Sequence, residues 1–452
     1  MDSKLPIAII GAGPVGLAAA CHLIARGLTP MIFEAGPSAG ASIENWAHVR
    51  MFSPWRFNID KQAATLLTAQ GWVAPAEGVY PTGRELLDDY VYQLSALPSV
   101  NRHLCLNTEV LAVTRFGQDV MKTKNRAAAS FLLRVRTPEG EKDVLASAVI
   151  DASGTFRSPN WMGAHGIPAL GEKDLAERIA YGIPEVLHSQ RQRYANRRVM
   201  VVGSGHSAFN VLQDLARLAL QELGTKIFWV IRGSSLDRIL GGGANDKLEE
   251  RGKLGQRIRQ LLNDGAIELF TNIAIDRVVA TDDGIVVEAG AQALPVVDEV
   301  VVATGFRPEL GLLAELRLAL DSATQSPIHL APLIDPNEHS CGTVRPHGAV
   351  ELAHPDEGVF IVGMKSYGRA PTFLLLTGYE QVRSVVAALA GDWDAAKRVE
   401  LVLPETGVCS TQFDDADCCD RAANPDCCEP TCCTDADKAA EGVPTSTRSC
   451  CS

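Results

Sequence analysis

Residues 5–36 read LPIAIIGAGPVGLAAACHLIARGLTPMIFEAG, and this stretch decides the fold. Its pattern predicts a buried strand over 5–10, a glycine-rich turn, a helix over 15–27 and a second strand over 30–36. That order of elements is the opening unit of a doubly wound parallel sheet. The glycines at fixed offsets argue against an export signal, for which Lys4 alone is also a weak charged leader.

The glycine turn fits the pattern G-x-G-x-x-G of dinucleotide-binding folds. The first glycine permits a tight turn, the second lets the backbone approach a pyrophosphate, and the third allows close packing of helix on strand. The acid that ends the second strand can accept hydrogen bonds from ribose hydroxyls. The alternative is a plain glycine-rich turn, but the flanking strand, helix and acid favour a dinucleotide. We predict that it is bound by Gly11, Gly13, Pro14, Gly16 and Glu34.

Residues 197–233 repeat this pattern, with a strand over 197–203, a helix over 204–223 and a strand over 226–233. Here Arg232 takes the place of the acid, and a cation can pair with a phosphate, so we predict NADPH rather than NADH. The alternative is an arginine that only leaves the strand into solvent. The predicted binding residues of this second site are Gly203, Ser204, Gly205, Ser207 and Arg232.

Two different nucleotide sites, FAD in the first and NADPH in the second, make a redox enzyme. Strand-like runs over 144–155 and 297–308 each end in a small-residue turn, and a helix is expected over 368–391 with Pro371 in its first turn. Its positive end could face the flavin; alternatively, Pro371 only starts the helix. From these elements we add the cofactor-binding residues Gly154, Thr304, Gly305, Gly363, Pro371 and Thr372.

The fold class is therefore α/β, with two Rossmann-like domains and the NADP domain inserted in a discontinuous FAD domain. We predict FAD-binding parts over 1–194 and 306–404, the NADP domain over 195–305, and a disordered acidic tail with cysteine pairs over 405–452. After Leu403 the chain has no Leu or Ile and one aromatic residue, so it cannot bury enough apolar surface to order itself.

The formal net charge of −12 is concentrated in this tail, and the rest of the chain shows no basic field for nucleic acid. No stretch reaches the roughly 18 uninterrupted apolar residues of a membrane span. We expect a cytoplasmic protein, either a monomer or a homodimer, with no nucleic-acid or membrane partner.

The paired fingerprints, with the turns over 151–154 and 303–305, resemble those of the two-dinucleotide-binding-domain flavoproteins over about residues 5–400. Disulfide reductases of that superfamily pass electrons to a cysteine pair, but residues 41–60, where such a pair is expected, contain no cysteine. This absence favours the monooxygenase branch, in which electrons go to oxygen. Trp55, in the same segment, could wall the flavin ring or be simple aromatic packing.

Two features depart from typical flavin-containing monooxygenases. Residues 182–192 keep only His188 of the motif that precedes the second fingerprint, and Met364 replaces an aspartate that binds the flavin ribityl chain in many relatives. The segments VRMFSPWRFNID (49–60), HSCGTVRPHG (339–348) and SYGRAPTF (366–373), with the cysteine-pair C-terminus, are instead similar to the flavin-dependent monooxygenases of bacterial arsenic-resistance operons. That resemblance implies oxidation of arsenite, methylarsenite or antimonite to pentavalent products, with NADPH and O2.

Nine cysteines lie in the tail, eight of them in adjacent pairs. Adjacent Cα atoms are about 3.8 Å apart, below the usual disulfide window, so each pair is better suited to chelation of a soft ion. A trivalent metalloid takes three sulfur ligands, and a thiol-rich arm would raise its local concentration. The alternative is a tail with no part in turnover. The predicted metalloid ligands are Cys409, Cys418, Cys419, Cys427, Cys428, Cys432, Cys433, Cys450 and Cys451.

Cys341, with His339 and His347 near it in the sequence, could line a substrate pocket or be a small buried residue, whereas Cys21 and Cys105 are expected in the core. No side chain is assigned as catalytic, because the cofactor performs the difficult chemistry. Two other functions stay open. One is a thiol-linked flavoprotein reductase of the thioredoxin or mercuric reductase type, and the other is a metalloid-binding scavenger.

Overall fold

The computed structural model describes residues 5–234, 236, 240, 249–337, 344–370 and 373–401, all within one compact unit, Met1–Gln412. The predicted cysteine tail and the segment around Cys341 lie outside the described residues. None of the described helices combines the length and apolar composition that crossing a bilayer requires.

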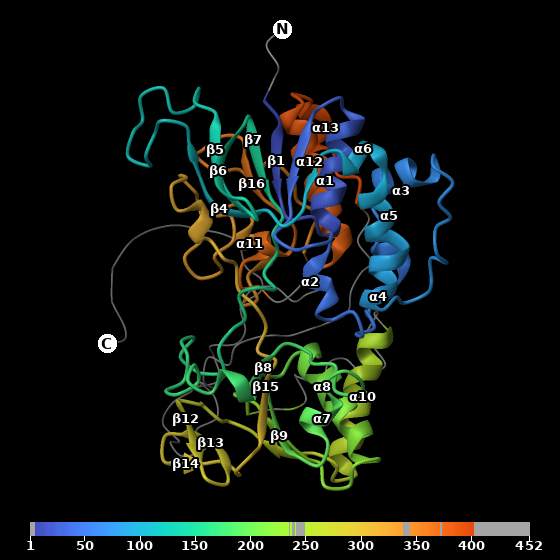
Figure 1. Cartoon of the computed structure of the whole chain (residues 1–452), viewed down its shortest axis with the longest axis vertical. Coiled ribbons are helices and arrows are strands. Elements are labelled where there is room, and N and C mark those ends of the chain that lie inside the picture. Colours follow the sequence, from blue (N-terminus) through green and yellow to red (C-terminus); the bar gives the residue numbers. More distant parts are fainter. Residues whose placement is uncertain are drawn as a thin grey trace, which may run out of the picture. The chain divides into compact units, whose positions relative to one another are not determined.

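The first sheet is parallel throughout, as predicted from the opening strand, turn and helix (Figure 1). In spatial order its strands are β16 (Val359–Ile361), β7 (Ala148–Asp151), β1 (Ile7–Ile10), β2 (Pro30–Phe33) and β3 (Leu104–Cys105). Strand β16 comes after the inserted segment that contains the second fingerprint, yet it pairs with β7 of the first sheet. The first domain is therefore discontinuous, as predicted.

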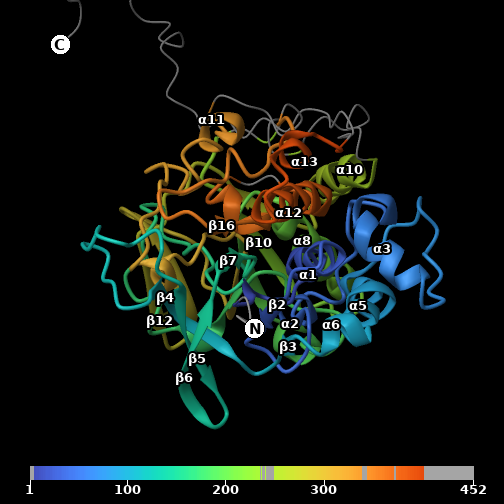
Figure 2. The same cartoon turned by 90° about the horizontal axis from the view of Figure 1, so that it is seen from above.

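Alternate residues of β1 point to opposite faces of this sheet, and each face has its own cover. Ile7 and Ile9 belong to the core shared with the helices, whereas Ala8 and Ile10 belong to the core beneath an antiparallel sheet. Figure 2 shows α1 and α12 beside one another on the helical face. The helices of the domain built on this first sheet are α1 (Pro14–Ala25), α2 (Ala41–Glu44), α3 (Lys61–Thr68), α4 (Gly83–Leu86), α5 (Tyr92–Ala96), α6 (Pro98–Asn101), α11 (Ala331–Ile334), α12 (Leu375–Leu389) and α13 (Trp393–Lys397).

The antiparallel cover consists of β4 (Glu109–Arg115), β5 (Phe131–Thr137) and β6 (Gly140–Ala146). Its long β4–β5 connection is fixed by a buried ion pair. Arg126 makes a bidentate contact with Asp356, whose shortest distance is 2.7 Å, and both side chains are 4% exposed. Arg126 also donates to the carbonyl oxygens of Asp119 and Glu315, which fastens the connection to the later part of the domain.

The second sheet repeats this architecture. It is parallel, with helices on one face and a three-stranded antiparallel sheet on the other. Strand β8 precedes residue 195, so this sheet takes a strand from before the predicted boundary; the boundaries 195 and 305 themselves stay predictions. The elements are β11 (Glu268–Phe270), β10 (Lys226–Val230), β9 (Arg198–Val202), β15 (Glu299–Val302) and β8 (Ile179–Tyr181), α7 (Arg191–Tyr194), α8 (His206–Ala219) and α10 (Glu249–Asn263), and β12 (Arg277–Thr281), β13 (Gly284–Ala289) and β14 (Gln292–Ala293).

The chain passes between the two sheets twice, and the two crossings are hydrogen-bonded to each other. Pro159 and Phe306 form an antiparallel bridge, and the Phe306 ring stacks on Phe156 at 5.2 Å. The Arg307 amide donates to the Ser158 carbonyl oxygen at 2.9 Å. The exit and the return of the chain are therefore neighbours.

One predicted element is corrected. Helix α12 begins at Leu375, because Leu374 is still extended (φ −115°, ψ 143°). Pro371 and Thr372 therefore precede the helix rather than forming its first turn, and they lie outside the described residues.

Candidate functional site

The first fingerprint is a turn in which two glycines are required by space. Gly11 has φ +98°, and a Cβ on it would lie 2.8 Å from the Ala152 carbonyl oxygen. A Cβ on Gly16 would lie 2.0 Å from the Gly11 carbonyl oxygen. No side chain fits at either position, so strand β1, helix α1 and the turn after β7 pack directly on one another.

Gly13 is different, because nothing lies within 4 Å of the position that its Cβ would take. It is the N-cap of α1, and no side chain caps this helix end. Pro14 follows at the first helical positions, where its missing N–H costs nothing. The open backbone at a 12-residue helix N-terminus suits the pyrophosphate of a dinucleotide.

Glu34 follows the end of β2 and fixes this turn. Its Oε2 accepts a hydrogen bond from the Ala12 amide and its Oε1 one from the Gly36 amide, both at 2.9 Å. Each carboxylate oxygen can accept a second bond, which leaves capacity for ribose hydroxyls.

Gly154 and Gly363 each adopt a positive φ, at +69° and +68°. Gly363 packs on the start of α1, since a Cβ on it would lie 3.4 Å from the Val15 side chain. Gly378, in the first turns of α12, is closer still, since a Cβ on it would lie 2.7 Å from Val15 Cγ2. Three segments distant in sequence thus meet at the fingerprint.

A buried amide holds the Gly363 turn. Gln381 Oε1 accepts from the Gly363 amide at 2.7 Å, and its Nε2 donates to Ser366 Oγ at 2.8 Å. The same amide nitrogen lies 2.8 Å from His347 Nε2, which must accept, because Nδ1 donates to the Arg345 carbonyl oxygen. This arrangement assigns the proton of His347 to Nδ1.

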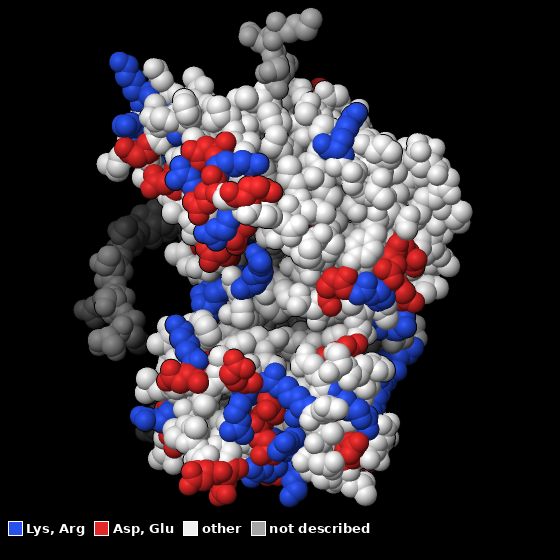
Figure 3. Space-filling model, viewed as in Figure 1, with Lys and Arg blue, Asp and Glu red and all other residues white. Residues whose placement is uncertain are grey.

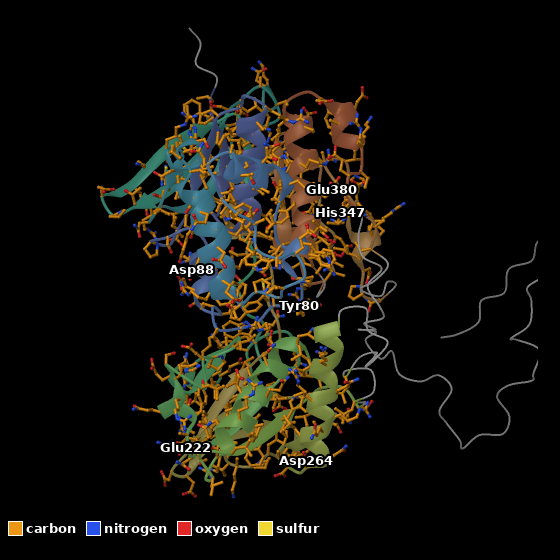
Figure 4. The ribbon with its side chains drawn as sticks, turned by 90° about the vertical axis from the view of Figure 1, so that its right-hand side faces the viewer. Tyr80, Asp88, Glu222, Asp264, His347 and Glu380 are labelled. Carbon is orange, nitrogen blue, oxygen red and sulfur yellow. The ribbon has the colours of Figure 1, made fainter. Side chains whose placement is uncertain are left out.

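His347 is therefore a neutral, buried part of the scaffold. Burial lowers the pKa of its imidazole, with the Arg345 carbonyl acting in the opposite direction. Figure 4 shows it beside Glu380 of α12. Its suggested neighbours in a substrate pocket, Cys341 and His339, lie outside the described residues.

Trp55 starts a short helix, Trp55–Phe57, and is 3% exposed within the core shared with α1 and α12. The following backbone is anchored by Tyr379, whose hydroxyl donates to the Asn58 carbonyl oxygen at 2.7 Å. These contacts fit the packing interpretation of Trp55, and its contact with flavin stays a prediction.

In the second fingerprint, as in the first, one glycine is required by space and another leaves the backbone at the helix N-terminus open. Gly203 has φ +132°, and a Cβ on it would lie 2.4 Å from the Ala303 carbonyl oxygen. Gly205 is the uncapped N-cap of α8, and nothing lies within 4 Å of its Cβ position. Ser204 is exposed and Ser207 is half-buried in the first turn of α8. The two turns are therefore built alike, each against the turn that follows a neighbouring strand.

Arg232 lies just after β10 and is exposed, with Nη1 3.4 Å from the Ala164 carbonyl oxygen. Thr304 Oγ1 donates to the Asn160 carbonyl oxygen at 2.7 Å, and Gly305 has φ +87°. The structure places these residues at the carboxyl edge of the second sheet, and their contacts with NADPH stay predictions.

The nine predicted cysteine ligands, with Pro371 and Thr372, lie outside the described residues. Within the described part, no group of three or more His, Cys, Asp or Glu side chains is arranged to hold a metal ion. Figure 3 shows acidic and basic side chains interspersed on the face in view.

Proteins of known function and known structure share this architecture. The chain is 26% identical over 326 residues to a ferredoxin–NADP reductase of Salinispora arenicola, covering 70% of this chain and 79% of that protein. Bacillithiol disulfide reductase Bdr (YpdA) of Bacillus cereus has a TM-score of 0.64 at 19% identity, over 86% of this chain and 99% of that one. The FAD-bound cadaverine monooxygenase DfoA of Erwinia amylovora has a TM-score of 0.61 at 14% identity, over 90% of this chain and 100% of that one. These two structures share the fold.

Residues 8–332 match the family of pyridine nucleotide-disulphide oxidoreductases, which is more than half of the chain. Both fingerprints and most of both sheets lie in the matched part. The chain therefore belongs to the pyridine nucleotide-disulphide oxidoreductase family, and it is an oxidoreductase whose cofactors are FAD and NADP(H).

Proposed function

We propose that the protein is a cytoplasmic FAD- and NADPH-dependent monooxygenase that oxidises trivalent arsenic or antimony compounds to their pentavalent forms. In the overall reaction, arsenite, O2, NADPH and a proton give arsenate, NADP⁺ and water. One oxygen atom of O2 goes to the metalloid and the other to water, and the metalloid lone pair becomes the new bond to oxygen. NADPH supplies the two further electrons.

The state of the described cysteines is the observation that favours a monooxygenase over a disulfide reductase. Of the twelve cysteines, the described residues include Cys21 and Cys105, and both are free. Cys21 is fully buried in α1, and burial together with the charge of Asp60 raises its thiol pKa far above the usual range. Burial also raises the pKa of Cys105. A cysteine accepts electrons from a flavin only as part of a disulfide, and these two thiols are free and kept protonated by burial. Neither described cysteine therefore competes with oxygen as the electron acceptor.

The substrate class rests on the tail and on the family resemblance of the sequence. Nine cysteines after residue 405 supply soft sulfur ligands of the kind that thiophilic metalloids prefer. A thiol-rich arm would collect metalloid and raise its effective concentration at the oxidising centre.

The described residues supply binding rather than covalent chemistry. Gly13 and the start of α1 would hold the FAD pyrophosphate, and Glu34 would accept from its ribose. Gly205 and the start of α8 would do the same for NADPH, and Arg232 would pair with its phosphate. FAD, when bound, accepts hydride from NADPH and passes electrons to oxygen.

A second candidate function is a thiol-linked reductase. It is favoured by the similarity to a ferredoxin–NADP reductase and by the fold shared with a bacillithiol disulfide reductase. In that case disulfides formed by the tail cysteines, rather than oxygen, would accept two electrons and become thiols.

The two functions are separated by measuring NADPH and oxygen consumption together, with arsenite, methylarsenite and antimonite added in turn. The monooxygenase consumes one O2 per NADPH in a metalloid-dependent way and yields a pentavalent product. A full-length variant with all nine tail cysteines replaced by serine is the matched control and should need more metalloid for the same rate. Metalloid-independent NADPH oxidation that continues without oxygen on a disulfide substrate would establish the reductase instead, and bound metalloid with no NADPH oxidation would establish a scavenger.

A further inference from the structure

A lysine is completely buried next to the FAD fingerprint. Lys365 lies in the short helix Gly363–Tyr367, and its side chain and that of Asp151 are both 0% exposed. Lys365 Nζ donates to Asp151 Oδ2 at 2.6 Å and to Ser153 Oγ at 3.0 Å. Asp151 Oδ1 accepts from both the amide and the hydroxyl of Ser153, at 3.1 and 2.6 Å.

Stability alone gives little reason for this pair. Removing two charges from water is expensive, and their attraction in the interior often only offsets that cost. Apolar residues of similar volume are frequently as stable at such places or more so. Buried ion pairs fix geometry in some proteins, and the segments that this pair joins indicate what it would fix here.

Each end of the pair belongs to a segment that packs on the FAD fingerprint. Asp151 is the last residue of β7, which lies between β1 and β16, and the carbonyl of the next residue, Ala152, closes on Gly11. Lys365 follows Gly363, which packs on Val15 in the first turn of α1. The pair therefore ties the turn after β7 to the turn after β16, and both of these turns pack on the fingerprint.

We propose that Lys365, Asp151 and Ser153 form an ionic latch that positions the Gly363 turn for FAD. The Lys365 side chain is fully buried, so it acts through the turn and is a positioning residue. Gln381 holds the same turn from the side of α12, through the Gly363 amide. The latch holds this turn from the side of β7, through Asp151. The Gly363 backbone is thereby kept at a fixed distance from the fingerprint. This inference rests on FAD binding and is independent of the proposed metalloid substrate.

The test measures FAD release from the full-length holoenzyme, by the recovery of free-flavin fluorescence after dilution, alongside urea unfolding. Lys365→Met should release FAD at least about tenfold faster, which corresponds to a loss of about 1.4 kcal/mol. Ser153→Ala removes one hydroxyl from the latch and should give a smaller acceleration in the same direction.

Lys365→Met leaves Asp151 without its counter-ion and will lower stability in any case. The double variant Lys365→Met/Asp151→Leu removes that unpaired charge. It should regain most of the stability and still release FAD faster than the unsubstituted protein. The matched control is Arg126→Met, which removes a similarly buried cation that fastens the β4–β5 connection and leaves Asp356 with Arg115, 3.5 Å away, as its remaining partner. This control should leave the FAD release rate unchanged at equal occupancy.

Two results would overturn the latch. One is an unchanged FAD release rate in both the double variant and Ser153→Ala, which would make the pair purely structural. The other is an equal acceleration in the Arg126→Met control, which would show that FAD release only follows global stability.

Discussion

The two kinds of glycine in the FAD fingerprint should respond differently to alanine. At Gly13 the backbone is ordinary (φ −75°) and nothing lies within 4 Å of the new methyl group. Alanine there restricts the unfolded chain, a gain of about 0.4–1 kcal/mol, and weakens the N-cap by a similar amount. The two effects oppose each other, so the chain's own stability should change by less than about 1 kcal/mol.

At Gly11 the same substitution puts a Cβ at φ +98° and 2.8 Å from the Ala152 carbonyl oxygen. The backbone strain alone is of order 1–3 kcal/mol, and the contact forces the turn apart. Gly11→Ala should therefore lower the free energy of unfolding by about 2 kcal/mol or more. Both variants should lose FAD affinity, Gly11→Ala because the turn moves and Gly13→Ala because the methyl group keeps the pyrophosphate from the amides.

The loss at Gly13 is that of one or two hydrogen bonds to a charged group, about 1.5–3 kcal/mol, or on the order of 10- to 100-fold in Kd. Denaturant unfolding at a series of FAD concentrations gives both quantities, because the extrapolation to zero FAD reports the chain and the rise with FAD reports the affinity. The reasoning fails if Gly13→Ala keeps the original FAD affinity, or if it destabilises the flavin-free chain as much as Gly11→Ala does.

Three further predictions concern other parts of the chain. Arg232→Ala should raise the KM for NADPH far more than that for NADH, since a cation there serves the extra phosphate; equal changes in steady-state kinetics would contradict its role. Burial lowers the pKa of the His354 imidazole to about 4, well below its ordinary value of about 6.5. The unfolded chain therefore binds the proton first as pH falls, and stability present above pH ~6.5 is lost down to pH ~4, by about 3 kcal/mol in all. The urea midpoint of His354→Asn should vary less over that interval, and an identical pH dependence in variant and parent would refute the assignment. Removing residues 405–452 should weaken arsenite and antimonite binding in calorimetry while flavin content and NADPH binding stay the same; unchanged metalloid affinity would exclude the capture role.

The glycine spacing was enough to predict both sheets, because Gly11, Gly16 and Gly203 stand where a Cβ would meet backbone. Backbone segments that approach this closely require glycine, and glycines at a fixed spacing can be recognised in the sequence. The discontinuous first sheet also followed from the late buried strand that became β16. The start of α12 was placed too early, since Pro371 suits a first helical turn but the extended residue Leu374 delays the helix.

Other parts of the site depend on contacts that sequence spacing cannot reveal. Lys365 and Asp151 are 214 residues apart, and neither residue type suggests burial. Gln381 similarly looked like one polar residue of a helix face, although it joins the Gly363 turn to His347. Gln381 is one of several polar residues buried in α12, with Thr377, Glu380 and Ser384, so the sequence does not single it out, and for Lys365 we find no signal either.

Because the two chain crossings lie next to each other, the segment that carries the second sheet could be excised as one piece. Ser158 and Arg307 are joined by one backbone hydrogen bond of 2.9 Å, so the ends left by excising everything between them already touch. A linker of about three residues would close that gap. The half with the first fingerprint would then be a continuous chain of its own, and the half with the second fingerprint could be exchanged for a related one without a change in the path of the rest of the chain.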